Sequence, residues 1–224
     1  MKRLHFHGHA SFVDLARFKR NTAIIGCMTT CDVCGRRLLA KSGRGSDLRY
    51  CSSACRQKAY RLRKALPAEL TGADRWLNWK PVRRGERWTK MPVRLDGRSA
   101  SSMDPGSWTS FEKAKGFGDR LGFALGGGFG CIDFDHVIAD GVLDPVVAGW
   151  LRECPPTFIE VSPSGDGLHV WGLLPEERGR VRVVDGVQVE AYSYGRFMTV
   201  TRRPFRGSVP RLADLTDFRK MLIR

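Results

Sequence analysis

The part of the chain between residues 121 and 201 is built from short apolar segments separated by tight turns that contain glycine. Asp185-Gly186, which lies between two of these segments, is a strong signal for a two-residue hairpin turn. Segments of this length and alternation predict β-strands, and their close spacing predicts antiparallel pairing. The expected hairpins join residues 121–125 with 129–135, 157–161 with 168–173, and 181–184 with 187–191, and a last strand covers 197–201.

Helices are expected around these strands. Residues 76–79 predict a first strand, and residues 109–112 have the form of a capping box that starts a short helix. Asp144-Pro145 is typical of a helix start, and a C-terminal helix is expected from about residue 212. The body is therefore predicted to be α+β, with an antiparallel or mixed sheet.

Two close pairs of cysteines stand in a basic segment: Cys31 with Cys34, and Cys51 with Cys55. The first spacing turns two thiolates toward one ion, and the second places both sulfurs on one face of a helix that starts near Ser52. Four thiolates form a closed structural Zn²⁺ site, which stabilises a segment too short for its own core. This pattern favours a metal site in a reducing compartment over a disulfide scaffold.

The other cysteines, Cys27, Cys131 and Cys154, have no partner at ligand spacing and are predicted to be small apolar residues. Residues 1–26, with histidines alternating between positions 5 and 9, are expected to form an extended N-terminal segment. No run approaches the ~18 apolar residues of a membrane helix. No export signal is visible, so the expected location is the cytoplasm.

Charge divides the chain into two parts. Residues 1–66 contain 15 Lys/Arg and 3 Asp, a net of +12, while the rest holds 23 Lys/Arg and 20 Asp/Glu, a net of +3. A basic region beside a near-neutral body is typical of a nucleic-acid-binding appendage, although a basic surface that only keeps a protein soluble has the same charge. The predicted parts are an extension (1–26), a zinc module (27–66), a linker (67–75) and a catalytic domain (76–224).

The sharpest chemical signal is the pair Asp133 and Asp135. Strand alternation puts both carboxylates on one face and directs Ile132 and Phe134 into the core. Adjacent carboxylates repel each other unless a cation lies between them, and Mg²⁺ or Mn²⁺ suits oxygen ligands. Two such ions would activate an attacking hydroxyl and stabilise a leaving pyrophosphate. The motif by itself also occurs in glycosyltransferases and in plain exposed strands.

A Ser/Gly-rich turn at residues 162–169 enters a strand. Backbone N–H groups at Gly165, the hydroxyl of Ser164 and the ring of His169 are suited to bind phosphate oxygens. Taken alone, the stretch is more typical of a hairpin loop with a structural histidine.

Glu190 lies on a predicted strand and would complete a two-metal cluster with the two aspartates, or it would be an exposed strand residue. Arg196, just before the last strand, would neutralise a triphosphate or be solvated.

The order of these motifs resembles that of the bifunctional primase-polymerases of phages and plasmids, within the archaeo-eukaryotic primase superfamily. The resemblance runs from about residue 76 to residue 206, more than half of the chain. It rests on residues 90–92, 104–112, 121–125, 132–136, 162–169 and 189–201. Residues 35–63 separately resemble small zinc-ribbon modules of actinobacteria and their phages.

The resemblance implies a sheet like that of an RNA-recognition motif, fused to a second α/β unit, with the active site between them. It implies that the catalytic metals are bound by Asp133, Asp135 and Glu190. The incoming NTP or dNTP would be held by Ser164, Gly165 and His169, with Lys90 and Arg196 as further candidates for phosphate or template contacts. The implied polymer substrate is a single-stranded DNA template, and the charge of the zinc module indicates that it contacts this template.

Many relatives carry a helicase after the primase domain, whereas this sequence has no Walker A motif. A separate replicative helicase is therefore an expected partner, and the protein is expected to be a monomer. Two alternatives remain: a catalytically inactive zinc-containing DNA-binding protein, and a metal-dependent nuclease. The intact acidic residues argue against the first, and the Ser/Gly turn ending in His169 favours a triphosphate substrate over the second.

Overall fold

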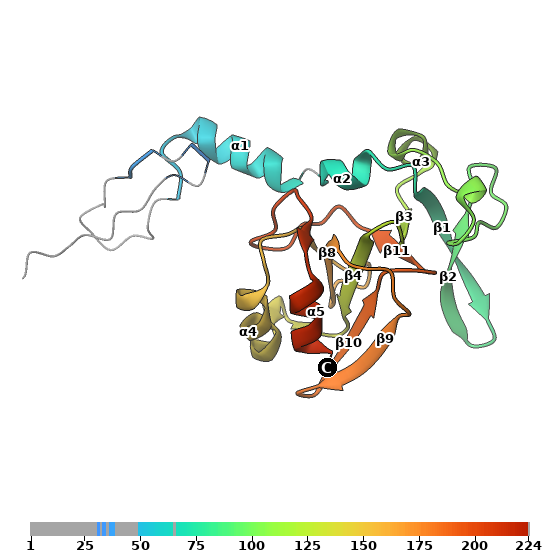
Figure 1. The fold of residues 1–224 in the computed structure, drawn as a ribbon. Coiled ribbons are helices and arrows are strands. Elements are labelled where there is room, and N and C mark those ends of the chain that lie inside the picture. Colours follow the sequence, from blue (N-terminus) through green and yellow to red (C-terminus); the bar gives the residue numbers. More distant parts are fainter. Residues whose placement is uncertain (1–30, 32, 35, 39–48, 65, 224) are drawn as a thin grey trace, which may run out of the picture. The chain divides into compact units, whose positions relative to one another are not determined.

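The computed structural model describes residues 31, 33–34, 36–38, 49–64 and 66–223. The expectations for residues 1–26 and for Cys27 lie outside the described residues. The chain divides into two compact units, residues 1–55 and 56–224, and each is described by itself (Figure 1).

The described part of the first unit contains the four cysteines and the start of helix α1 (Ser53–Lys64). The backbone N–H of Cys31 donates to the carbonyl of Arg36 at 2.8 Å and closes the turn between the first two cysteines. The hydroxyl of Ser52 accepts a hydrogen bond from the backbone N–H of Cys55 at 3.2 Å, which satisfies a donor in the first turn of α1. The helix predicted to start near Ser52 is therefore confirmed.

The second unit contains two main sheets. The smaller sheet is antiparallel, in the order β11-β3-β1-β2, and its strands are β11 (Phe197–Val200), β3 (Leu121–Ala124), β1 (Trp76–Arg84) and β2 (Arg87–Val93). The larger sheet has the order β12-β8-β4-β10-β9, and β7 also pairs with β8. Its strands are β12 (Ala213–Asp214), β8 (Leu168–Leu173), β4 (Phe129–Phe134), β10 (Val187–Tyr192), β9 (Arg180–Val184) and β7 (Ile159–Val161). Only β12 pairs in parallel among these described strands.

Helices and two short strands complete the second unit, and the prediction of an α+β body is confirmed. They are α2 (Ala68–Thr71), the 3₁₀ turn η1 (Pro105–Ser107), α3 (Phe111–Phe117), α4 (Pro145–Glu153), α5 (Thr216–Leu222), β5 (Ile138–Ala139) and β6 (Val142–Leu143). α4 begins as predicted, because the carboxylate of Asp144 accepts the backbone N–H groups of Val146 and Val147. No helix in the described ranges is long and apolar enough to cross a membrane.

The hairpin predicted for residues 121–135 is wrong. β3 pairs with β1 and β11 in the smaller sheet, whereas β4 pairs with β8 and β10 in the larger one. Gly126, Gly127 and Gly128 between them all have positive φ, a conformation that glycine adopts without steric cost. The three glycines thus carry the chain from one sheet to the other, and two adjacent apolar strands do not become a pair.

Two helix starts also differ from the prediction. Ser110, not Thr109, precedes α3 and makes no side-chain cap; Thr109 instead exchanges two backbone hydrogen bonds with Trp76 of β1. The C-terminal helix begins at Thr216 rather than near residue 212, because β12 first pairs with β8. Gly172 of β8 permits this pairing, since a Cβ there would lie 2.6 Å from the carbonyl oxygen of Ala213.

The central strands β4 and β8 of the larger sheet are buried on both faces, whereas the edge strand β9 is mostly exposed. One face packs against α4 and α5 (Figure 1), and Ile132 and Phe134 lie fully buried on this side, as predicted. Burial of each such side chain contributes about 1.5–3 kcal/mol at most. The opposite face belongs to an aromatic cluster in which the rings of Phe123 and Trp171 meet edge to face, with centroids 6.1 Å apart. The predicted catalytic residues lie on this second face.

Candidate functional site

Four polar residues form a row across the second face of the larger sheet, one from each of four neighbouring strands. The strand register pairs Glu160 with His169, His169 with Asp133, and Asp133 with Glu190. Directly opposed residues point to the same side of a sheet, so all four side chains share one face. Glu160 and His169 are 0% and 2% exposed. Buried polar groups destabilise a fold unless they are paired, so each member of this row needs a hydrogen-bond partner or a bound ion.

Asp133, Asp135 and Glu190 form an acidic cluster in which one ligand oxygen of each lies within 4.8 Å of the others. Burial raises the pKa of Asp133 to about 6; the charge of His169 opposes this rise, and the charges of Asp135 and Glu190 add to it. One oxygen of Asp133, Oδ1, is buried without a hydrogen-bond partner among the described residues. A divalent cation between the three carboxylates would satisfy this oxygen and remove the repulsion. The donor set therefore fits Mg²⁺ or Mn²⁺.

Glu190 is oriented by its strand neighbours. Its Oε1 accepts a hydrogen bond from Gln188 at 2.8 Å, and its Oε2 accepts one from the Tyr192 hydroxyl at 2.5 Å. The guanidinium of Arg196 lies 4.1 Å above the centroid of the Tyr192 ring. Arg196 is thus linked to the acidic cluster through Tyr192.

Glu160 orients His169. The Oε1 atom of Glu160 lies 3.3 Å from Nδ1 of His169 and accepts a hydrogen bond from Nε1 of Trp171 at 3.1 Å. An ionised carboxylate only accepts, so Nδ1 of His169 carries the hydrogen and Nε2 is the other ring nitrogen available to the site. That Nε2 lies 3.8 Å from Oδ1 of Asp133, beyond direct hydrogen-bond distance.

The second oxygen of Glu160 ties the sheet to the segment after β11. It accepts hydrogen bonds from the backbone N–H groups of Thr201 and Arg202, both at 2.9 Å. The Thr201 hydroxyl is 3.0 Å away, but its one hydrogen has a closer acceptor in the carbonyl of Val161 at 2.7 Å. With four N–H donors, this buried carboxylate is satisfied, in contrast to Asp133. Both carboxylate oxygens of Glu160 therefore accept hydrogen bonds from the protein, whereas Oδ1 of Asp133 accepts none and is open to a ligand.

The Ser/Gly turn lies beside the end of β4, because Val137 and Ile138 both donate backbone hydrogen bonds to the carbonyl of Asp166. Gly165 has a φ of +98°, as a tight glycine turn requires, and its N–H donates to the carbonyl of Ser162 at 3.1 Å. The Ser164 hydroxyl contacts the hydroxyl of Ser162 and the carboxylate of Asp166. Both predicted phosphate ligands in this turn, Ser164 and Gly165, are therefore engaged within the turn itself.

Lys90 lies on the exposed part of β2, and its ammonium group is 6.0 Å from the centroid of the Trp79 ring. Its charge lowers the pKa of Asp133 and so offsets part of the effect of burial. Lys90 is therefore near enough to the acidic cluster to act on it electrostatically.

Sequence reasoning missed Glu160, Gln188 and Tyr192. Glu160 had a detectable signal, since it alternates with Ile159 and Val161 on a predicted strand and shares the face of the buried Phe158. An acidic residue at a buried strand position predicts a polar partner on the next strand. Pairing residues 157–161 with 168–173 in the correct register would have placed that partner at His169.

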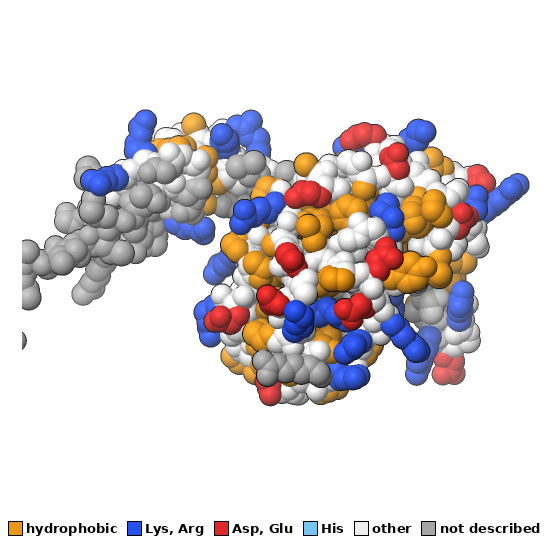
Figure 2. Space-filling view, viewed as in Figure 1, with side chains coloured by type: hydrophobic (Ala, Val, Ile, Leu, Met, Phe, Trp, Pro, Cys, Tyr) orange, Lys and Arg blue, Asp and Glu red, His pale blue; other side chains and the backbone are white. Residues whose placement is uncertain are grey.

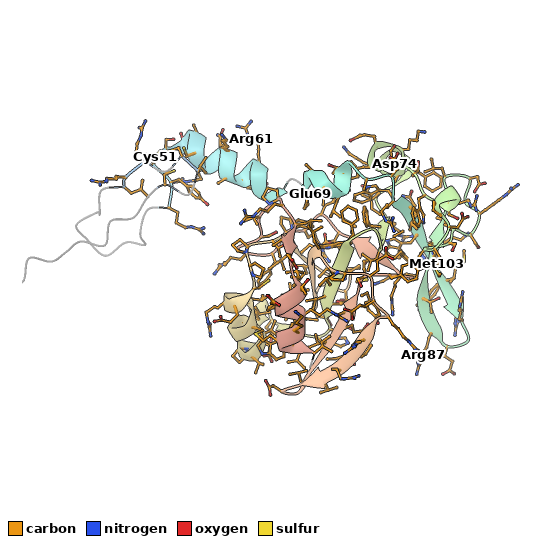
Figure 3. The ribbon with its side chains drawn as sticks, in the orientation of Figure 1. Cys51, Arg61, Glu69, Asp74, Arg87 and Met103 are labelled. Carbon is orange, nitrogen blue, oxygen red and sulfur yellow. The ribbon has the colours of Figure 1, made fainter. Side chains whose placement is uncertain are left out.

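The four cysteines of the first unit form a second ligand cluster. Their sulfurs all lie within 4.8 Å of one another, and those of Cys34 and Cys51 are 3.4 Å apart. Figure 3 shows Cys51 immediately before α1. Hydrogen bonds with the thiols of Cys34 and Cys55 raise the pKa of Cys51 to about 12, while the backbone N–H of Cys51 lowers the pKa of Cys31 to about 6. Four thiols at these distances do not all ionise without a cation, and their geometry fits Zn²⁺.

The two other described cysteines take no part in this cluster. Cys131 is fully buried in the aromatic cluster, and Cys154 packs against the opposite core. Burial raises the pKa of both thiols, to about 12 for Cys154. Both behave as the small apolar residues predicted from their spacing.

Comparison of the sequence with known proteins finds a relative encoded by a phage. A protein of Nitratiruptor phage NrS-1, named "DNA Primase-polymerase", is 37% identical to the chain over 152 residues, which cover 62% of the chain. The chain is homologous to part of this phage primase-polymerase. The resemblance noted in the sequence is thereby confirmed. The matched part is 20% of the relative's own length, and no family model matches the chain.

Proposed function

We propose that the chain is a DNA-templated primase-polymerase that adds nucleotides from NTP or dNTP by two-metal nucleotidyl transfer. The observation that carries this proposal is the acidic cluster of Asp133, Asp135 and Glu190, in which Asp133 has a buried oxygen without a hydrogen-bond partner among the described residues. This oxygen lies 3.8 Å from the ring of an oriented histidine. Homology to a phage primase-polymerase supports the same reaction. We further propose that the two-sheet body is a catalytic core of the archaeo-eukaryotic primase type.

Each residue of the row has a role in this proposal. Asp133, Asp135 and Glu190 would hold Mg²⁺ or Mn²⁺, which when bound activates the attacking 3′-hydroxyl and neutralises charge on the reacting phosphate. As an imidazolium, with a hydrogen on each ring nitrogen, His169 would donate from Nε2 to the incoming triphosphate while Nδ1 donates to Glu160, which fixes the orientation of the ring. Arg196 would balance further phosphate charge while Tyr192 holds its guanidinium in place.

The turn residues Ser164 and Gly165 are proposed to contact the triphosphate only after exchanging their present partners within the turn. A phosphate oxygen is a strong acceptor, and it would compete with Asp166 for the Ser164 hydroxyl. This exchange would couple nucleotide binding to the His136–Asp166 pair, whose atoms are 2.6 Å apart.

The alternative of an inactive DNA-binding body is disfavoured by the same observation. A buried carboxylate oxygen without a partner destabilises a fold, and a body used only for binding would gain stability by replacing it. In the proposed assembly the four-cysteine module holds Zn²⁺ and contacts single-stranded DNA template, and a separate replicative helicase supplies unwinding. The protein would act as a monomer in the host cytoplasm.

The test is synthesis on single-stranded DNA by the purified protein, with labelled NTP or dNTP, with and without a primer, in Mg²⁺ or Mn²⁺. Asp133→Asn and Asp135→Asn should lower the rate of synthesis by on the order of 100-fold or more. Each removes a negative charge that would hold the metal ions, and those ions would stabilise the transition state. Asp217→Asn, whose side chain is 95% exposed on α5, is the matched control and should retain the wild-type rate. Absence of product from the wild type under every condition would refute the proposal.

A further inference from the structure

The β1–β2 hairpin extends beyond the smaller sheet. β3 pairs with residues 76–78 of β1, and the N–H of Trp79 donates to the carbonyl of Arg120 just before β3, so residues 80–84 pair with β2 alone. The hairpin, residues 76–93, carries five Lys/Arg and one acidic residue. Figure 2 shows Lys and Arg side chains gathered near the free end of the hairpin, where Figure 3 places Arg87. The end of the hairpin beyond the smaller sheet therefore presents a basic surface.

One face of this hairpin combines aromatic rings with positive charge. The register pairs Arg83 with Trp88, and strand alternation places Trp79 and Lys90 on the same side; we call these four residues the Trp88 face. Trp88 is 70% exposed, and no aromatic residue in the described ranges is recorded as more exposed. A single exposed apolar side chain is common on protein surfaces, so Trp88 points to a ligand through its combination with the cations beside it.

The cations on this face are available for a ligand. No ion pair is recorded for Arg83 or Lys90 within the described part of the chain. Trp79 already lies between two cations, since its ring centroid is 6.0 Å from the Lys90 ammonium and 5.6 Å from the Arg120 guanidinium.

We propose that the Trp88 face binds single-stranded nucleic acid, stacking a base on Trp88 and holding backbone phosphates with Arg83 and Lys90. The proposal rests on the proposed function and names a surface that binds the template strand. Aromatic rings alternating with cations are the usual platform for unpaired nucleic acid, because every base has a face to stack and every nucleotide a phosphate. A duplex has no free base faces, so the contribution of Trp88 should be specific to single strands.

The experiment measures the affinity of the full chain for a labelled single-stranded oligonucleotide of about 20 nucleotides, without nucleotide, Mg²⁺ or Mn²⁺. Trp88→Ala should raise Kd by roughly 5- to 150-fold, the value of one stacked base, and Trp88→Phe should restore most of the affinity. The effect should be absent with a blunt duplex of the same sequence.

Lys90→Ala has a matched control in Lys80→Ala. Both lysines are exposed, but Lys80 pairs with Met91 and so points to the opposite face of the hairpin. Lys90→Ala should reduce the slope of log Kd against log salt by about 0.7, the value for one phosphate contact with a single strand, and Lys80→Ala should leave it unchanged.

Wild-type affinity in Trp88→Ala and Lys90→Ala would overturn the proposal and assign the Trp88 face to a protein partner, even if the wild type synthesises DNA. The predicted losses of affinity without any synthesis by the wild type would support this surface and count against the proposed function. The binding surface and the proposed function can therefore be refuted independently of each other.

Discussion

Asp133→Asn should make the protein more stable while removing its activity. Burial raises the pKa of Asp133 from its ordinary value of 3.8 to about 6. Above pH 6 the wild type therefore holds an ionised group that folding disfavours by about two pKa units, or about 3 kcal/mol. The asparagine is similar in size and carries no charge, so it removes this cost.

The sign follows from protonation. The folded state holds the proton of Asp133 more tightly than the unfolded state, so wild-type stability falls as pH rises from about 4 to above 6. The gain from Asp133→Asn should therefore be near zero at about pH 3.5 and reach about 3 kcal/mol at about pH 8. For a domain of this size that gain corresponds to a rise in Tm of about 6–12 °C.

The assay is thermal or urea unfolding at several pH values, after transfer of the protein into buffer without Mg²⁺ or Mn²⁺. Adding Mg²⁺ should stabilise the wild type and leave Asp133→Asn nearly unaffected, because binding to the folded state alone raises stability. Asp217→Asn, on the exposed surface of α5, should show neither effect. A variant that is less stable than the wild type at pH 8, or a difference that does not depend on pH, would refute the reasoning.

Two further changes test the surroundings of the site. Glu160→Gln should lower the free energy of unfolding by about 1–3 kcal/mol, because the buried donors around Glu160 lose a charged acceptor. It should also raise the KM for nucleotide, because His169 loses its orientation. Unfolding curves and nucleotide titrations measure the two effects, and an unchanged KM would contradict the role of Glu160. Cys51→Ser should abolish the binding of one zinc ion per chain, measured by elemental analysis, while Cys154→Ser should bind zinc like the wild type; zinc retained in Cys51→Ser would contradict the four-cysteine site.

Much of the fold was predictable because local signals determine it. The Asp185-Gly186 turn has positive φ at both residues, as its sequence requires, and it joins β9 to β10 in the expected hairpin. Strand alternation correctly separated Asp133 and Asp135 from Ile132 and Phe134. In these cases the conformation depends on neighbours within a few residues.

The wrong or missing predictions concern features that depend on contacts between residues far apart in the sequence. The pairing of β3 with β1 and β11, rather than with β4, depends on strands more than 40 residues away, and the three glycines between β3 and β4 are compatible with either pairing. The start of α5 depends on the space that Gly172 leaves for β12. The role of Glu160 depends on a row formed by four strands, which no single segment reveals.

The central claim is that the acidic cluster binds the divalent ions of nucleotidyl transfer, and Mn²⁺ binding tests it most directly. Free Mn²⁺ is measured by electron paramagnetic resonance during titration of the protein, with and without a nucleotide triphosphate. The account predicts Mn²⁺ binding by the wild type and by Asp217→Asn, and its loss in Asp135→Asn and Glu190→Gln. Equal binding by all four proteins would contradict it.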